Sequence, residues 1–454
     1  MLSSINPASN EVLQQFEEMS SDEINKIIDS ADKQFNRWKW SSFKERAPLM
    51  KNAAEVIRKK KDDLAALITL EMGKPILQSK GEVEKCAWVC DYYSENAEEF
   101  LKDEIIKTDA SKSFVTFNPF GVVLSIMPWN FPFWQVFRFA APTLMAGNAG
   151  LLKHSSNVTG CALAIENIFK EAGFPQDLFR TLVIGSSKVE QVIKNDKVMA
   201  VSLTGSVGAG KKVAAAAGSV LKKCVLELGG SDPYIILEDA DLDKAAEICV
   251  NSRLINNGQS CIAAKRFIAV ERIYDEFERL FVDKMHIKKM GDPFNEEINL
   301  GPQARTDLRD ELHEQVEKSI SAGAKPLLGC RTPELIGAFY PASVLADVKP
   351  GMPAYEEELF GPVASLIKAK DEDDAIRIAN DSIFGLGSAI FTKEVERGER
   401  LAKEKINSGC CFVNDSVKSD PRLPFGGIKE SGYGRELSSY GIKEFVNIKT
   451  VYVK

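Results

Sequence analysis

Residues 198–212 read VMAVSLTGSVGAGKK, and this stretch gives the clearest indication of how the chain folds. Val198–Thr204 is a short, mostly apolar run that predicts a strand. A glycine turn follows, and Gly210–Val220 is expected to form a helix. Glycines at the start of a helix let backbone N–H groups approach phosphate, so the stretch also predicts contact with a phosphorylated ligand.

The alternation of strand and helix begins upstream of this stretch. The pattern predicts strands at Gly150–Lys153 and Thr181–Ile184, and helices at Thr159–Ala172 and Val189–Lys194. Such alternation is typical of parallel βαβ units with helices on both faces of the sheet. Ligands of these sheets bind at the carboxyl ends of the strands, so the site is expected there.

Four further regions complete the organisation of the chain. Residues 21–101 have helical periodicity, residues 114–127 are β-rich, and residues 229–414 form a second α/β segment. The final segment, 445–453, alternates as a strand. A terminal strand has an unpaired edge unless something covers it, so this strand is a candidate for pairing with another subunit.

Composition limits the classes of function. The chain has 454 residues, enough for two or more domains, with 44% hydrophobic and 27% charged residues. A formal net charge of -7 argues against nonspecific binding of nucleic acid or anionic membrane. The N-terminus lacks the features of a secretory signal, and no apolar run is long enough for a transmembrane helix.

The cysteines and histidines indicate a cytoplasmic protein without a metal site. There are nine cysteines, an odd number, and no CxxC pair. This pattern resembles neither a disulfide framework nor a zinc site, and a reducing compartment fits it best. The three histidines, His154, His286 and His313, are scattered along the sequence.

A cysteine nucleophile is predicted at Cys261, which ends the motif NNGQSC at 256–261. The motif lies between a predicted helix, Ala245–Ile255, and a predicted strand, Arg266–Val270. A thiol at such a junction can face a cleft while regular structure holds its backbone, and cysteine is intrinsically nucleophilic. The alternative is that Cys261 is a small buried hydrophobic residue. The polar, glycine-containing sequence that precedes it argues against this alternative.

Two more motifs supply groups that would assist a nucleophile. Glu227, in Leu226–Gly230, is flanked by apolar residues, and partial desolvation would raise its pKa toward that of a general base. The alternative is a strand glutamate that points to solvent. Asn130 lies in the PWNFP motif at 128–132, where two prolines would fix an amide donor for an oxyanion. The alternative there is an Asx turn.

The glycine-rich stretch also allows a nucleotide-hydrolysing protein as a competing hypothesis. It nearly satisfies the P-loop pattern, but Lys212 occupies the position of the hydroxyl that would bind a metal ion. No acidic strand end follows, and the GxGxxG pattern is not met either. Phosphate contact is expected and nucleotide hydrolysis is not. A non-catalytic binding protein is a third possibility.

Taken together, the motifs resemble those of the aldehyde dehydrogenase superfamily over nearly the whole chain. In order, they are LEMGKP at 70–75, PWNFP at 128–132, Lys153, TGS at 204–206, ELGG at 227–230, GQSC at 258–261, ELFGP at 358–362 and PFGG at 424–427. The resemblance implies an α/β protein with a Rossmann-type cofactor domain (1–101 and 121–228), an α/β catalytic domain (229–430) and a small β oligomerisation element (102–120 and 431–454). A homodimer or homotetramer is expected.

The resemblance also implies roles for individual residues. Cys261 would attack the aldehyde, Asn130 and the Cys261 N–H would hold the oxyanion, and Glu227 would activate the water that hydrolyses the thioester. The implied cofactor-binding residues are Met127, Trp129, Lys153, Ser156, Gly205, Ser206, Gly210, Glu358 and Phe360. Many members have a lysine where this chain has Phe139, so a proton relay there is in doubt; Glu436 is an alternative carboxylate.

Two positions bear on the ligands. Members that prefer NAD often have a glutamate where this chain has Ser156, so a 2′-phosphate would meet no repulsion; NADP is expected to be preferred and NAD possible. Arg138 follows Asn130 by about two helical turns and would suit a substrate carboxylate. Its alternative is a structural salt bridge. Trp134 and Ser419 are the other expected substrate contacts.

Within the superfamily, the sequence is most similar to the short bacterial succinate-semialdehyde dehydrogenases. The resemblance rests on the runs WNFPFWQVFR, LLKHSS and KKCVLELGGSDPYI. It implies oxidation of succinate semialdehyde or a similar ω-oxo acid. The alternative within the family is a broad-specificity enzyme for neutral aldehydes.

Overall fold

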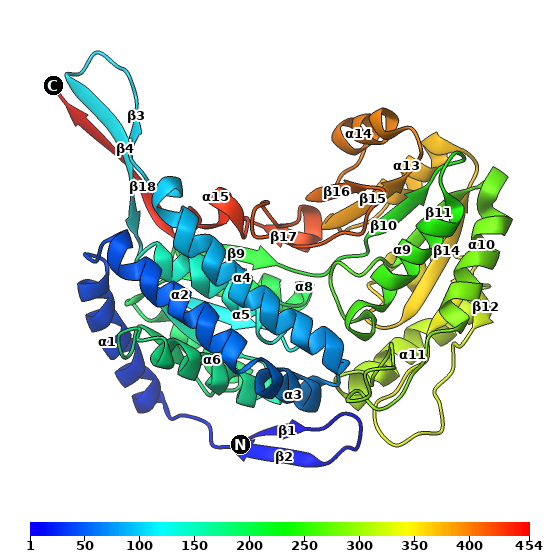
Figure 1. Ribbon diagram of the computed structural model, residues 1–454, viewed down its shortest axis with the longest axis horizontal. Coiled ribbons are helices and arrows are strands. Elements are labelled where there is room, and N and C mark those ends of the chain that lie inside the picture. Colours follow the sequence, from blue (N-terminus) through cyan, green and yellow to red (C-terminus); the bar gives the residue numbers. More distant parts are fainter.

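The computed structural model describes all 454 residues and contains two lobes, each built on a β-sheet (Figure 1). The sheet of the first lobe has the strand order β17-β9-β8-β5-β6-β7. Its strands are β5 (Val122–Met127), β6 (Ala149–His154), β7 (Phe179–Thr181), β8 (Val198–Thr204), β9 (Lys223–Glu227) and β17 (Gly432–Tyr433). All neighbours are parallel except β17 and β9.

Helices cover this sheet and close one large hydrophobic core. Four helices come from the N-terminal region: α1 (Ser21–Trp38), α2 (Phe43–Lys59), α3 (Lys61–Met72) and α4 (Ile76–Phe100). The others are α5 (Trp134–Met145), α6 (Thr159–Glu171), α7 (Val189–Lys194) and α8 (Val207–Gly218). No helix is long and apolar enough to cross a membrane.

The second lobe contains a seven-stranded sheet of order β12-β13-β14-β11-β10-β15-β16. Its strands are β10 (Pro233–Ile236), β11 (Arg266–Val270), β12 (Lys325–Leu328), β13 (Ser343–Ala346), β14 (Val363–Ala369), β15 (Gly387–Phe391) and β16 (Cys410–Val413). Tyr234 and Ile236 enter one core whereas Ile235 and Leu237 enter another. Successive residues therefore point to opposite, covered faces, as expected for buried parallel strands.

The helices of the second lobe are distributed over these two faces. They are α9 (Leu242–Leu254), α10 (Glu271–His286), α11 (Thr306–Ser321), α12 (Pro353–Glu356), α13 (Glu372–Asn380) and α14 (Val395–Glu404). At the N-terminus, β1 (Leu2–Ile5) and β2 (Val12–Phe16) form a hairpin. Pro7 in this hairpin accepts a hydrogen bond from the Ala338 backbone N–H, so the hairpin also contacts the second lobe.

A third, three-stranded sheet projects from the first lobe (Figure 1). It contains β3 (Glu104–Ile105), β4 (Lys112–Pro119) and β18 (Val446–Val453), and β18 pairs with β4 along its whole length. Ile105, Ile448 and Tyr452 are exposed on this sheet. The terminal strand therefore has one edge paired within the chain and the other edge open.

The sequence predictions for the elements are largely confirmed, with three corrections. The strand predicted at Thr181–Ile184 is β7, which ends at Thr181. The helix predicted to begin at Gly210 begins at Val207, because the Ser206 side chain caps it and accepts from the Ala209 N–H at 3.3 Å. The oligomerisation element was predicted to resume at residue 431, but β17 is an edge strand of the first lobe's sheet, and only β18 joins the projecting sheet.

Candidate functional site

Cys261 lies where two cavities meet. It lines a cavity of about 590 Å³ together with Phe131, Trp134 and Phe425. It also lines a second cavity of about 300 Å³ with Gly205 and Phe360. One side chain can therefore contact a ligand in either cavity, which is the geometry required of a group that reacts with one bound molecule in the presence of another.

The backbone that carries Cys261 is held by an unusual turn. After α9 ends, Asn256 and Asn257 adopt left-handed conformations with φ of 53° and 57°. Asparagine tolerates this conformation better than most residues. The Asn257 amide donates to the Gly73 and Pro302 carbonyls at 3.0 and 2.8 Å. The sharp turn is thus tied to the loop that follows α3.

Asn130 is fixed by the same turn. Its backbone carbonyl accepts from Asn256 Nδ2 at 2.6 Å, and its own Nδ2 donates to the Gln259 carbonyl at 3.1 Å. The Oδ1 atom of Asn130 accepts no hydrogen bond, which excludes the Asx turn considered from sequence. Asn130 and Cys261 both line the smaller cavity, so the amide predicted as an oxyanion donor lies in the same cavity as the thiol.

Lys265 is a residue of this site that the sequence patterns did not identify. It is 1% exposed, and its ammonium group donates to the carbonyls of Ser260 and Cys261 at 2.8 Å each. It also pairs with Glu358 at 3.2 Å. A lysine directly before a buried strand needs polar partners inside the protein. The position of Lys265 beside the predicted strand Arg266–Val270 is therefore the sequence signal that could have identified it.

Electrostatics at Cys261 favour the neutral thiol. Burial raises the pKa of Cys261 to about 12, and the positive charges of Arg138 and Lys265 only partly oppose this effect. The other eight cysteines are also free, and six of them are buried. In the absence of ligands the thiolate is therefore a minor species at neutral pH.

Glu227, at the end of β9, belongs to a buried group of charged side chains. Its carboxylate is 2% exposed and accepts no hydrogen bond, which excludes a solvent-facing glutamate. Burial, and next the charge of Glu436, raise its pKa well above the ordinary value. Glu227 itself lines neither cavity, although its neighbours Leu228 and Gly229 line the smaller one.

Arg138 lines the larger cavity as predicted, but its charge is already compensated. The guanidinium pairs with buried Glu436, donates to Thr204 Oγ1 at 3.3 Å and lies 4.8 Å from the ring centre of Phe425. Arg138 thus makes the structural salt bridge considered as the alternative, and its role as a substrate contact stays a prediction. Phe139 packs against Phe445, so its position holds no proton-relay group.

The smaller cavity contains five of the residues predicted to bind a cofactor. They are Trp129, Gly205, Ser206, Glu358 and Phe360. The rings of Trp129 and Phe360 meet edge to face with centres 5.7 Å apart. Glu358 accepts from the Gly230 N–H at 3.1 Å in addition to its pair with Lys265. The cavity thus combines an aromatic wall, a helix N-terminus and a carboxylate.

The other four predicted cofactor residues lie outside this cavity. Met127 is buried at the end of β5, and Gly210 is inside α8, where a Cβ atom would come within 2.6 Å of Leu228. Gly210 therefore allows the helix to pack closely on the chain that follows β9. Lys153 is the last residue but one of the neighbouring strand β6, burial lowers its pKa, and no carboxylate lies within 4 Å of its ammonium group. Ser156 is exposed in the turn that follows.

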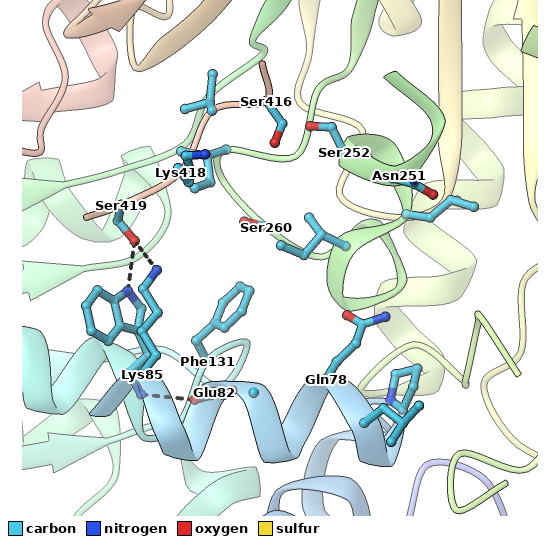
Figure 2. A pocket seen from close by; sticks show the side chains of 18 of the residues that line it. Gln78, Glu82, Lys85, Phe131, Asn251, Ser252, Ser260, Ser416, Lys418 and Ser419 are labelled. Atoms are coloured by element: carbon cyan, nitrogen blue, oxygen red, sulfur yellow. Dashed lines mark hydrogen bonds between the residues drawn. The ribbon is translucent and has the colours of Figure 1, made fainter. Parts of the chain in front are cut away.

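The larger cavity brings together the predicted substrate residues Trp134 and Ser419. Figure 2 shows Ser419 in the wall of this cavity. The Trp134 indole donates to Ser419 Oγ at 3.1 Å. The same oxygen accepts from Lys85 Nζ at 2.9 Å, a contact that the sequence patterns did not reveal. No group of three or more histidine, cysteine or acidic side chains is arranged to hold a metal ion.

The raised pKa of Cys261 predicts how the free thiol reacts. Without cofactor, its alkylation by iodoacetamide should accelerate about tenfold per pH unit from pH 7 to 10, because the thiolate fraction grows until the pKa is reached. Peptide mapping by mass spectrometry gives the rate at Cys261 itself. A plateau below pH 9 would contradict the assigned environment.

Known proteins resemble this chain over its full length. The sequence model of the aldehyde dehydrogenase family matches residues 1–451 of this chain. A probable NADP-dependent succinate-semialdehyde dehydrogenase of Synechocystis is 48% identical, with 100% of this chain and 99% of the relative covered. A succinate-semialdehyde dehydrogenase of Escherichia coli named for both NAD and NADP is 46% identical, with 99% and 97% covered.

Solved structures agree as well. The structure of a succinic semialdehyde dehydrogenase from Streptococcus pyogenes in complex with NADP+ superposes with a TM-score of 0.98 at 37% identity, and all of both chains is covered. The two-lobe α/β fold expected from the sequence is thereby confirmed. On the evidence of the matched family, the full-length relatives and the shared fold, this chain belongs to the aldehyde dehydrogenase family.

Proposed function

We propose that this protein oxidises succinate semialdehyde, or a similar ω-oxo acid, to the dicarboxylic acid, with NADP preferred and NAD accepted. The observation that carries the proposal is the position of Cys261 in the walls of both cavities. The larger cavity would hold the aldehyde and the smaller one the nicotinamide end of the cofactor. The names of the full-length relatives support the substrate and the cofactor.

In the proposed reaction, Cys261 attacks the aldehyde carbonyl and forms a thiohemiacetal. The Asn130 amide, which is held in place before the reaction, and the Cys261 N–H stabilise the oxyanion. The C–H bond of this adduct would then break, its hydrogen and electron pair would pass as hydride to the oxidised cofactor, and a thioester would remain on Cys261. Glu227 then takes a proton from the water that hydrolyses this thioester, and its raised pKa suits this role.

The residues around the smaller cavity fit a dinucleotide. When bound, the oxidised nicotinamide supplies the electron acceptor and a positive charge that favours the Cys261 thiolate. Gly205 and Ser206, at the N-terminus of α8, would lie near the pyrophosphate, and Glu358 near the nicotinamide ribose. Lys153, whose charge has no carboxylate partner, would lie at the adenosine end with Ser156. Met127 would support this end from β5.

The alternative is a broad-specificity enzyme for neutral aldehydes, which the aromatic residues of the larger cavity would also suit. The ratio of kcat/KM for succinate semialdehyde to that for butanal separates the two. Our proposal requires a large preference for the charged substrate. Equal values for the two aldehydes would leave only the broad-specificity function.

We further propose that the protein acts as a homodimer or homotetramer in the cytoplasm. The open edge of the projecting sheet, with exposed Ile105, Ile448 and Tyr452, supports pairing with a second copy. A reaction that depends on a reduced Cys261 supports a reducing compartment. The partner molecule is the small aldehyde substrate, and the net charge of -7 gives no support to a nucleic-acid partner.

Replacement of Ser156 by glutamate tests the cofactor assignment. The ratio of kcat/KM for NADP to that for NAD should fall at least about tenfold in Ser156→Glu, because a carboxylate would repel the 2′-phosphate. Ser156→Ala is the matched control, since it removes the hydroxyl without adding charge, and should change the ratio less. An unchanged ratio in Ser156→Glu would place the 2′-phosphate elsewhere.

Replacement of Glu227 by glutamine tests the hydrolytic step. Mixing Glu227→Gln with NADP and substrate should give a burst of about one NADPH per site and then turnover about 100- to 10,000-fold slower, because only the general base is lost. Stopped-flow absorbance measures both phases. Glu430→Gln, a surface carboxylate paired with Lys211, is the control. Loss of the burst would assign Glu227 to the first step instead.

A further inference from the structure

The larger cavity contains a lysine that the proposed reaction does not yet use. Lys85 extends from α4 into this cavity, and its ammonium group donates to Ser419 Oγ at 2.9 Å (Figure 2). The same ammonium lies 4.1 Å from the ring centre of Trp134. Three residues from different parts of the chain thus meet at one place on the cavity wall.

The Ser419 hydroxyl has one donor unused. Its oxygen accepts from both Lys85 Nζ and the Trp134 indole N–H, which uses both of its acceptor sites. Its own O–H donates to no protein group, although Ser419 is only 5% exposed. The Lys85 ammonium has three donors and makes one hydrogen bond. Unused donors that converge beside a cavity are complementary to a carboxylate.

The charge of Lys85 is also uncompensated, in contrast to most of its neighbours. No carboxylate oxygen lies within 4 Å of Lys85, whereas Arg138 pairs with Glu436. The nearby acids are engaged elsewhere: Glu82 pairs with Lys74 and Asp420 with Arg422. A half-buried cation without a partner is unfavourable unless it meets an anion.

We propose that Lys85, together with the Ser419 hydroxyl, binds the carboxylate of the substrate and thereby selects ω-oxo acids over neutral aldehydes. This inference rests on the proposed function and adds Lys85 to the contacts that the sequence suggested for Arg138 and Ser419. Arg138 also lines this cavity, but its charge is already matched by Glu436, whereas the charge of Lys85 has no carboxylate partner.

The electrostatic surroundings agree with this assignment. Burial, and next the charge of Arg138 on α5, lower the pKa of Lys85 to about 8. Glu82 and Cys86 on α4 and Asp420 in the loop before PFGG act in the opposite direction but do not restore the ordinary value. A bound carboxylate would stabilise the charged form of Lys85, so binding of the substrate relieves an unfavourable state of the free enzyme.

The test compares Lys85→Met with Lys288→Met in the full-length enzyme at saturating NADP. Lys288 also lines the cavity without a carboxylate partner, but it donates to Asn251 and is distant in sequence from the Ser419 group. In Lys85→Met, the kcat/KM ratio of succinate semialdehyde to butanal should fall about 10- to 100-fold, mainly through KM, because a charge-assisted contact is lost. In Lys288→Met the ratio should change less than about threefold.

A second readout does not depend on turnover of the charged substrate. Succinate should inhibit butanal oxidation by the wild type, and its inhibition constant should rise in Lys85→Met and recover partly in Lys85→Arg, which restores the positive charge. The affinity for NADP, measured by fluorescence titration, shows whether each variant is folded. If Lys85→Met is misfolded, Lys85→Gln replaces it in the test, and the same rise in the inhibition constant of succinate is expected.

The outcomes separate the two proposals. A wild type that does not prefer succinate semialdehyde to butanal would overturn the proposed function, whatever the variants do. A wild type that has the preference, with Lys85→Met and Lys85→Gln retaining it, would overturn the role of Lys85 alone. An equal loss in Lys288→Met would also overturn it, because the effect would then come from the overall charge of the cavity.

Discussion

The site depends on a backbone constraint between α9 and β11. Two consecutive left-handed asparagines turn the chain, Asn257 ties the turn to the loop after α3, and Lys265 holds the carbonyls of Ser260 and Cys261. Through these contacts the thiol-bearing residue lies in the walls of both cavities rather than in the core of either lobe. Contacts from both lobes therefore hold the backbone that carries the Cys261 side chain.

Buried charge surrounds Cys261, and two of the buried cations are matched by a carboxylate. Arg138 is matched by Glu436, and Lys265 by Glu358. Glu227 and Lys85 lack such partners: the Glu227 carboxylate accepts no hydrogen bond, and the Lys85 ammonium has no carboxylate partner. Burial without a partner shifts the pKa of each toward neutrality. Unmatched groups of this kind are unfavourable for folding and are retained where a ligand or a reaction uses them.

The sequence predicted the fold class, most helices and strands, and the residues Cys261, Asn130 and Glu227, because local periodicity and short motifs carry that information. It did not predict contacts between distant segments. Lys85 and Ser419 meet across 334 residues of sequence, and α4 shows no local pattern that marks Lys85. The pairing of Arg138 with Glu436 is also a contact between distant segments. The sequence around Arg138 therefore did not show which carboxylate would be its partner. The roles of the catalytic, substrate and cofactor residues stay predictions.

The central claim is that Cys261 carries the acyl group while the second cavity holds the cofactor. Peptide mass mapping of acid-quenched Glu227→Gln, after reaction with succinate semialdehyde, tests it most directly. A succinyl group on the Cys261 peptide, formed only when NADP or NAD is present, is the predicted result. An acyl group on another residue, or none on Cys261 despite reduction of the cofactor, would contradict the account.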